Sequence, residues 1–165
     1  IDAFANFKAL RGHEQVKLVL VGSEPSGQTM SALPSMKEQI VSHNLVQDVL
    51  LPGYLSDQEI AALYANAAAY VFPSTNEGFG YPVLEAFAYQ CPVLISNQPA
   101  LVEVGGDAVL VFDQNDVDEL TQGLVDLYQN EQLRQAYIKK GTERLRHFDR
   151  QNYIADLEQL MTKYV

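Results

Sequence analysis

The sequence lacks any apolar run close to the ~20 residues that a membrane-spanning helix needs, and its first residues lack the charged and apolar regions of a signal peptide. It holds a single cysteine, Cys91, so no internal disulfide can form and a reducing compartment is the simpler interpretation. We expect Cys91 to be a small buried apolar residue. The predicted location is the cytoplasm, either free or peripheral to the membrane through another part of the protein.

Positive charge is also scarce. Lys and Arg number 11 against 21 Asp and Glu, which gives a net charge of −10. A nucleic-acid surface needs clustered cations, so nucleic acid is not expected as a partner. The histidines His13, His43 and His147 stand apart from one another, and no plausible cluster of metal ligands is visible. We therefore predict no metal site and interpret each histidine as structural or solvated.

What the sequence does contain is the composition and pattern of one domain, spanning 1–165. Its 165 residues, 47% of them hydrophobic, are enough for a substantial core. Short apolar runs alternate with helical patterns, which predicts an α/β fold, a Rossmann-like and mostly parallel sheet with helices on both faces. Because the chain opens on a helical pattern, we expect its first strand to be missing upstream. The predicted strands are 16–21, 46–51, 68–72, 92–95 and 108–112; the predicted helices are 1–7, 30–43, 60–66, 82–89, 115–128, one that ends at 147, and 151–165.

Local signals mark several ends of these elements. Pro52-Gly53 is expected to break the second strand. Ser56 and Glu59 fit a capping box, with Ser56 as the N-cap of the next helix. Pro82 suits the first turn of a helix, and Asn115-Asp116 can cap another.

Two acidic residues are conspicuous because their surroundings carry so little charge. Between Glu59 and Glu103 only Glu77 and Glu85 are charged, whereas a chain with 19% charged residues would place about eight in those 43 positions. A buried carboxylate is costly unless it has a partner. Structural explanations stay open for each residue alone, since Glu85 can be a first-turn acid favoured by the helix dipole and Glu77 a solvated loop charge.

Together with the glycine-rich turn Gly78-Phe79-Gly80, these carboxylates indicate a ligand-binding site. Such a turn at the start of a helix offers free backbone N–H groups to an anion and can form a phosphate-binding site that uses no lysine. Glu85, about one turn into the helix, would reach the vicinal hydroxyls of a ribose attached to that phosphate. Glu77 could meet hydroxyls beyond the second phosphate. The layout fits a nucleotide diphosphate with a sugar attached.

The segment from Phe72 to Ala86 also resembles the signature of group 1 retaining glycosyltransferases, in which seven residues separate two glutamates. These enzymes have the GT-B fold. The ordered set of matches covers nearly the whole chain, which makes the resemblance specific. Further matches lie at Lys17–Gly22, Gly53–Ser56, Pro92–Leu94, Glu103–Val104, Gly106–Ala108 and Asp116–Leu120.

The resemblance implies a nucleotide-sugar-binding C-terminal domain, whose substrate is a donor such as a GDP- or UDP-hexose. The acceptor would enter from an N-terminal domain, the implied partner, which is absent from this chain. Such a hexosyltransferase moves its sugar with retention at the anomeric carbon and needs neither metal nor other cofactor. Because catalysis needs the N-terminal domain to position the acceptor and exclude water, we expect the isolated chain to be inactive. The first strand and an Arg- and Lys-bearing loop of the family would lie upstream, so we also expect weak donor binding.

The resemblance also implies roles for particular residues. Glu77 would be catalytic, contacting the transferred sugar and stabilising positive charge in the transition state. Glu85 would bind the ribose hydroxyls. The backbone of Gly78, Phe79 and Gly80 would hold the diphosphate or sugar. Gly22 and the backbone of Tyr54 and Leu55 would border the phosphate and base.

Other interpretations remain open. The chain could be a noncatalytic Rossmann-like module that binds a nucleotide or a protein, or part of a nucleotide-sugar epimerase. A phosphorylase would need a lysine near the loop, and none is present. A flavodoxin-like domain would carry a phosphate loop or acidic cluster after its first strand, where Gly22-Ser23-Glu24-Pro25 stands instead. The donor's sugar and base and the identity of the acceptor have no readable code in the sequence.

Overall fold

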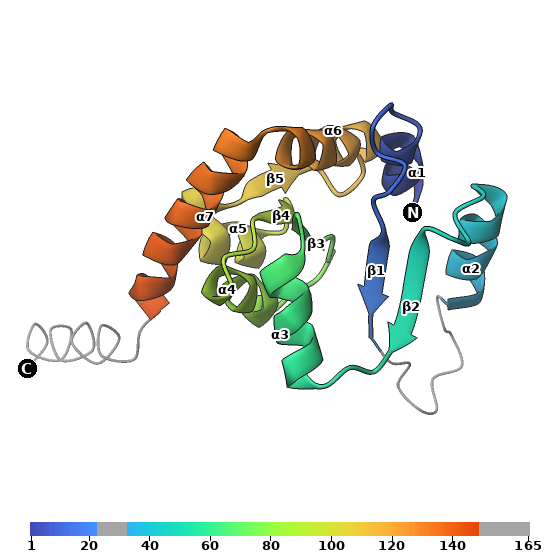
Figure 1. The fold of residues 1–165 in the computed structure, drawn as a ribbon. Coiled ribbons are helices and arrows are strands. Elements are labelled where there is room, and N and C mark those ends of the chain that lie inside the picture. The colour runs from blue at the N-terminus through green and yellow to red at the C-terminus, as the bar shows by residue number, and fades with distance from the viewer. Residues whose placement is uncertain (23–32, 149–165) are drawn as a thin grey trace, which may run out of the picture.

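The computed structural model describes residues 1–22 and 33–148 of the chain (Figure 1). The expected helix 151–165, the start of the expected helix 30–43, and Ser23-Glu24-Pro25 lie outside the described residues. Strands and helices alternate, as the sequence pattern predicts. The elements are α1 (Asp2–Lys8), β1 (Leu18–Val21), α2 (Leu33–Ser42), β2 (Val49–Gly53), α3 (Asp57–Asn66), β3 (Tyr70–Phe72), α4 (Tyr81–Ala88), β4 (Val93–Ser96), α5 (Pro99–Gly105), the 3-10 turn η1 (Gly106–Ala108), β5 (Leu110–Phe112), α6 (Val117–Gln129), α7 (Glu131–Leu145) and the 3-10 turn η2 (Arg146–Phe148).

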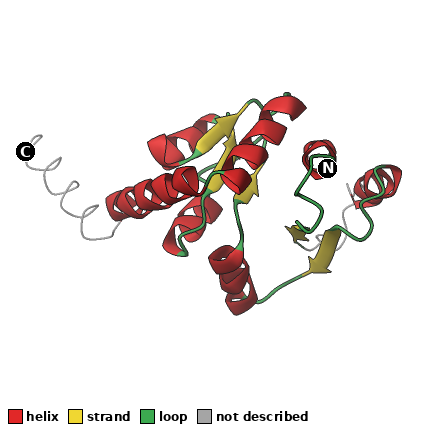
Figure 2. Ribbon diagram, turned by 45° about the horizontal axis from the view of Figure 1, so that its top comes forward, coloured by secondary structure: helices red, strands yellow, loops and turns green. Residues whose placement is uncertain are grey.

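The expected parallel α/β class is confirmed, and every strand pair is parallel. The hydrogen-bonded strands fall into two sheets, β1-β2 and β3-β4-β5. Figure 2 shows the strands of the larger sheet enclosed by helices. Within the described ranges, β1 and β3 each pair along one edge only. The missing first strand stays a prediction.

The core of the larger sheet is centred on β4, whose four residues are all buried. Burial on both faces explains its continuous apolar run. Helix α4 packs against β4, and α7 crosses α4 where Gly141 meets Phe87. A Cβ on Gly141 would lie 2.6 Å from Phe87 Cδ1, so only glycine allows this approach. Cys91 is buried, as expected, and burial raises the pKa of its thiol to about 12.

One local expectation needs correction, and one helix was not expected. Pro52-Gly53 does not break the second strand, because β2 runs through both residues to Gly53. Proline is tolerated there since β2 pairs only with β1 and is an edge strand. Helix α5 was not predicted, because its seven residues are too few to establish a helical period. The capping box is confirmed: Ser56 Oγ accepts from the Glu59 N–H, and the Glu59 carboxylate accepts from the Ser56 N–H at 2.8 Å.

The smaller sheet is joined to the rest by helix packing between α1 and α6. Phe7 of α1 meets Tyr128 of α6 edge to face, with ring centroids 5.5 Å apart. The ring of His13 stacks on Phe7 at 4.0 Å, and its Nδ1 lies 2.8 Å from the Phe7 carbonyl oxygen. His13 is therefore a core residue, in line with the structural interpretation. His43 instead pairs with Asp2 near the surface, at 2.8 Å.

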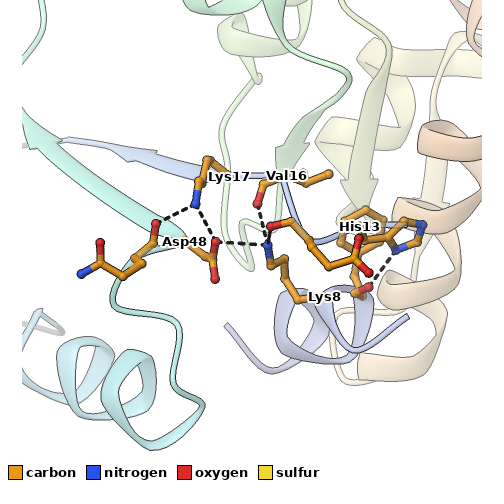
Figure 3. A network of polar contacts seen from close by, with 8 residues as sticks. Lys8, His13, Val16, Lys17 and Asp48 are labelled. Carbon is orange, nitrogen blue, oxygen red and sulfur yellow. Dashed lines mark hydrogen bonds and ion pairs between the residues drawn. The ribbon is translucent and has the colours of Figure 1, made fainter. Parts of the chain in front are cut away.

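Asp48 connects α1 with the start of the smaller sheet (Figure 3). Its carboxylate accepts from Lys17 Nζ at 2.7 Å and from Lys8 Nζ at 3.1 Å. Lys8 also donates to the Val16 carbonyl oxygen, at 3.2 Å, just before β1. Hydrogen bonds from Lys17 and Lys8 hold the pKa of Asp48 below its usual value. The ionised carboxylate thus stabilises the approach of α1 to β1 and β2.

This pairing predicts a pH dependence of stability. A carboxyl group whose pKa is lower in the folded state stabilises the fold above its unfolded pKa, and that contribution is lost as the pH falls through the folded pKa. We expect Asp48→Asn to lower the free energy of unfolding at pH 6 and the difference from wild type to shrink below about pH 4. Urea unfolding of both proteins at several pH values measures this difference in the free energy of unfolding. Glu38→Gln, on exposed α2, is the control; an Asp48→Asn difference that does not change with pH would contradict the assignment.

Candidate functional site

The site is built around the turn between β3 and α4. Strand β3 ends at Phe72, residues 73–80 form the expected loop, and α4 begins at Tyr81 with Pro82 in its first turn. Gly80 is the N-cap and has φ of +99°, in the left-handed region. A Cβ there would lie 2.6 Å from Leu101 Cδ2. Both its backbone conformation and the lack of space therefore require glycine.

Two polar side chains at the end of β4 hold the loop in place. Ser96 is fully buried and donates through Oγ to the carbonyl oxygen of Ser74. Gln98 donates through Nε2 to the carbonyl oxygen of Glu77 at 3.2 Å, and its Oε1 caps α5 by accepting from the Ala100 N–H at 2.6 Å. Neither residue was predicted. The available signals were a polar residue that closes an apolar strand and an amide directly before Pro99.

The start of α4 presents backbone donors. Gly80 has no side chain to cap the helix, and no other side-chain cap bond is formed there. Pro82 has no N–H and the Val83 N–H donates to the Gly80 carbonyl oxygen at 3.0 Å, so among the first three residues of α4 the Tyr81 N–H is the one available for an anion, with the helix dipole favouring it. Gly78 faces open space, since a Cβ there would meet nothing within 4 Å. Phe79 packs on Tyr81, with ring centroids 4.8 Å apart, which shields one side of the turn.

The two carboxylates lie on the two segments that flank this turn. Glu77 is half-buried on the loop, and Glu85 is exposed on α4. Both charges act on Tyr70 of β3: burial is the largest cause that raises the pKa of Tyr70, and the charges of Glu85 and Glu77 raise it further. Neither carboxylate forms an ion pair within the described parts of the chain. Each can therefore accept hydrogen bonds from ligand hydroxyls.

The remaining predicted residues form a second group on the other sheet. Gly22 follows β1 and donates its N–H to the Gly53 carbonyl oxygen at 3.2 Å, which places it beside the end of β2. Tyr54 comes next and is 80% exposed, while Leu55 is half-buried. The structure therefore brings Gly22 close to Tyr54, while the charges of Glu77 and Glu85 both act on Tyr70. No hydrogen bond or ring contact links these two groups within the described residues.

A hollow of about 320 Å³ lies beside the turn. Arg144 borders it but is engaged with backbone carbonyl groups, since its Nε donates to Val104 O at 3.0 Å. Another hollow, along α2, lies away from both carboxylates. The hollow beside the turn is lined by Gly78, Phe79, Ala100, Glu103, Val104, Arg144 and Phe148.

Residues 1–22 and 33–148 contain neither a cluster of metal ligands nor a helix that could cross a membrane. No group of three or more His, Cys, Asp and Glu side chains in these ranges could hold a metal ion. No helix in them is both long and apolar enough to cross a membrane.

The comparisons with known proteins agree with this architecture. The family described as "Glycosyl transferases group 1" matches residues 1–144, and the chain belongs to that family. The resemblance seen in the sequence is thereby confirmed.

Among curated relatives, the chain is similar to the O-antigen chain mannosyltransferase B of Escherichia coli, at 40% identity over 100 residues, which cover 61% of this chain and 26% of the relative. It is also similar to the MMP alpha-(1->4)-mannosyltransferase of Mycolicibacterium hassiacum, at 37% identity over 117 residues, which cover 68% of this chain and 26% of that protein. The matches thus span about a quarter of the length of these relatives.

Among solved structures, the fold is similar to that of a sucrose-phosphate synthase from Thermosynechococcus elongatus, with a TM-score of 0.79 and 23% identity over 99% of this chain and 41% of the other. It is also similar to the C-terminal domain of a group 1 family glycosyl transferase from Francisella tularensis, with a TM-score of 0.73 and 21% identity over 87% of this chain and 76% of that domain. The fold is therefore that of a GT-B C-terminal domain.

The conformation of Gly80 predicts how its substitution changes the free energy of unfolding. Gly80→Ala must place a Cβ against Leu101 in a left-handed backbone conformation, which we expect to cost about 2 to 4 kcal/mol of unfolding free energy. Denaturant unfolding measures this. Gly78→Ala is the matched control, because its position is open and its change should stay within about 0.5 kcal/mol. Equal effects of the two variants would show that the turn does not depend on Gly80.

Proposed function

We propose that this chain is the donor-binding domain of a hexosyltransferase that moves a sugar from a nucleotide diphosphate to an acceptor with retention at the anomeric carbon. The observation that supports this most is the placing of Glu77 and Glu85 on either side of the uncapped, glycine-bounded start of α4. Membership of the group 1 glycosyltransferases supports the reaction class.

In this proposal the diphosphate lies at the N-terminus of α4. The backbone N–H groups of Gly78, Phe79 and Gly80 donate to the diphosphate oxygens, and the helix dipole stabilises the negative charge of these oxygens. As the bond to the sugar breaks, negative charge grows on the leaving phosphate, so the same donors stabilise the transition state more than the ground state.

The two carboxylates take different roles. Glu85 accepts hydrogen bonds from the two vicinal ribose hydroxyls, which orients the nucleotide. Glu77 lies on the loop side, next to the transferred sugar, where its charge stabilises an oxocarbenium-like transition state. It does not have to become a covalent nucleophile. The Gly22 and Tyr54-Leu55 group borders the phosphate and the base.

We propose a mannosyl group as the transferred sugar, because the names of both relatives above are those of mannosyltransferases. A GDP- or UDP-linked hexose is the donor. The acceptor is bound by an N-terminal domain of the same cytoplasmic enzyme, which also brings cations to the diphosphate. Proximity of donor and acceptor contributes ~7 to 11 kcal/mol in such reactions, so the chain alone is not expected to turn over.

The ribose role is tested by Glu85→Gln in the full-length enzyme. Losing a hydrogen-bonded charge should weaken donor binding by about 1.5 to 3 kcal/mol while the fold survives. Calorimetry with GDP and UDP measures the affinity, and Glu38→Gln on α2 is the matched control. Unchanged affinity in a well-folded Glu85→Gln protein would remove the proposed ribose contact.

Metal dependence is a separate test. If amide donors and side chains alone stabilise the leaving diphosphate, activity of the full-length enzyme should persist in a chelator. Release of free nucleoside diphosphate is followed with and without EDTA. Complete loss of activity that magnesium or manganese restores would contradict the metal-free mechanism.

A further inference from the structure

The turn Gly78-Phe79-Gly80 carries a single side chain, the ring of Phe79. Glycine on either side leaves the backbone of this turn many accessible conformations, and selecting one of them costs conformational entropy. Backbone donors stabilise a developing charge best when their direction is already fixed. Gly78 has no packing neighbour to fix it, since a Cβ there would meet nothing within 4 Å. The contacts of the Phe79 ring therefore decide how firmly the loop side of the turn is held.

The end of α7 supplies the contact that holds this ring. Phe148, in η2 directly after α7, meets Phe79 edge to face, with ring centroids 6.0 Å apart. Edge-to-face packing is a preferred arrangement of aromatic pairs, because the positive edge of one ring meets the negative face of the other. Phe148 is half-buried and also packs against the apolar cluster that includes Val83 and Ile95. The core of the larger sheet thus supports Phe79 through Phe148.

Arg144, in the last turn of α7, holds the Phe148 ring in turn. Its Cζ lies 5.2 Å from the ring centroid, within the range of a cation–π interaction. Its Nε donates to the Val104 carbonyl oxygen at 3.0 Å and its Nη2 to the Glu103 carbonyl oxygen at 2.5 Å. Both carbonyl groups lie in the last turn of α5, where a helix leaves carbonyl groups without intrahelical partners. A guanidinium can donate in its plane and stack through its face at once, which suits it to this position.

These side chains surround one space beside the turn. The hollow of about 320 Å³ is lined by Gly78, Phe79, Arg144 and Phe148, among other residues. Helix α7 also packs along α4, the helix that the turn begins, so the two are fixed relative to one another (Figure 1). The turn and the end of α7 therefore face each other across the hollow, and the edge-to-face ring pair joins them.

We propose that Phe148 and Arg144 are positioning residues that fix the Phe79 ring and, through it, the direction of the turn's backbone N–H groups toward the donor diphosphate. This inference rests on the proposed function, which places the diphosphate at this turn. It adds two residues at the end of a different helix, outside the signature of the two glutamates.

The test compares a nucleotide that has two phosphates with one that has a single phosphate. Calorimetry on the full-length enzyme measures the dissociation constants of GDP and GMP, with UDP and UMP in parallel. Phe148→Ala removes the ring that holds Phe79 and leaves the proposed ribose and base contacts in place. We expect it to weaken diphosphate binding about two- to tenfold more than monophosphate binding, the range for the loss of one hydrogen bond. A purely structural role would lower the free energy of unfolding and leave the ratio of the two dissociation constants at its wild-type value.

Two matched controls lie on the same helix. Tyr137→Ala also removes a half-buried ring, but that ring packs on the apolar cluster around Leu94; it should destabilise the fold and keep the wild-type ratio. Arg144→Gln should shift the ratio in the same direction as Phe148→Ala, to a smaller degree. Lys139→Gln, which removes an exposed positive charge from α7, should not shift it.

Two further variants identify how the residues act. If Arg144 acted on the diphosphate through its charge alone, Arg144→Lys would behave as wild type. Positioning requires the planar guanidinium, so Arg144→Lys should resemble Arg144→Gln, and a wild-type ratio would overturn the role of Arg144. In the Phe79→Ala background, Phe148→Ala should change the ratio no further, because the ring that it holds is gone.

The outcomes separate this inference from the proposed function. If the wild-type enzyme binds GDP no more tightly than GMP and UDP no more tightly than UMP, the diphosphate does not lie at the turn and both fall. If the wild type prefers the diphosphate and Phe148→Ala keeps the same ratio, the positioning role is overturned and the diphosphate site stands. If Phe148→Ala does not fold, Phe148→Leu decides, since it keeps most of the apolar volume and loses the ring; a wild-type ratio in that variant overturns the proposal.

Discussion

Gly80 occupies the one position on which the geometry of the site depends. Its left-handed conformation turns the chain from the loop after β3 into α4, and its missing side chain lets the turn lie directly against Leu101. The turn sets where the first N–H groups of α4 point. It also sets the separation of Glu77, which precedes it, from Glu85, which follows it. Buried Ser96 and half-buried Gln98 then hold the loop from the end of the neighbouring strand, so the site stands on rigid elements.

The proposed diphosphate site raises an electrostatic problem in a chain of net charge −10, and neutral backbone donors address it. Backbone amides at the start of α4 supply partial positive charge without a cation. The residues between Glu59 and Glu103 include no Lys, Arg or His, so this segment places no side-chain cation of its own beside the turn.

Local chemistry made much of this predictable from the sequence. The capping box at Ser56 and the proline-led start of α4 depend on contacts within a few residues, and both are confirmed. The extension of β2 through Pro52 was not predictable, because it depends on β2 being an edge strand, which is a property of the sheet. Ser96 and Gln98 were missed for a similar reason. Their partners, the carbonyl groups of Ser74 and Glu77, are 22 and 21 residues away, and only the fold brings them together.

The two groups of predicted ligand-binding residues are related by helix packing and not by a strand ladder. Gly22 and Tyr54 stand on the sheet β1-β2, whereas Glu77 and Glu85 belong to the sheet β3-β4-β5. The contact of α1 with α6, with His13 stacked against Phe7, links the two sheets, and Asp48 ties α1 to β1 and β2. Backbone ladders hold neighbouring strands at a fixed spacing, while packed helices can slide by small amounts. The relative placement of the two groups of predicted residues therefore depends on the α1–α6 packing as well as on the backbone ladders within each sheet.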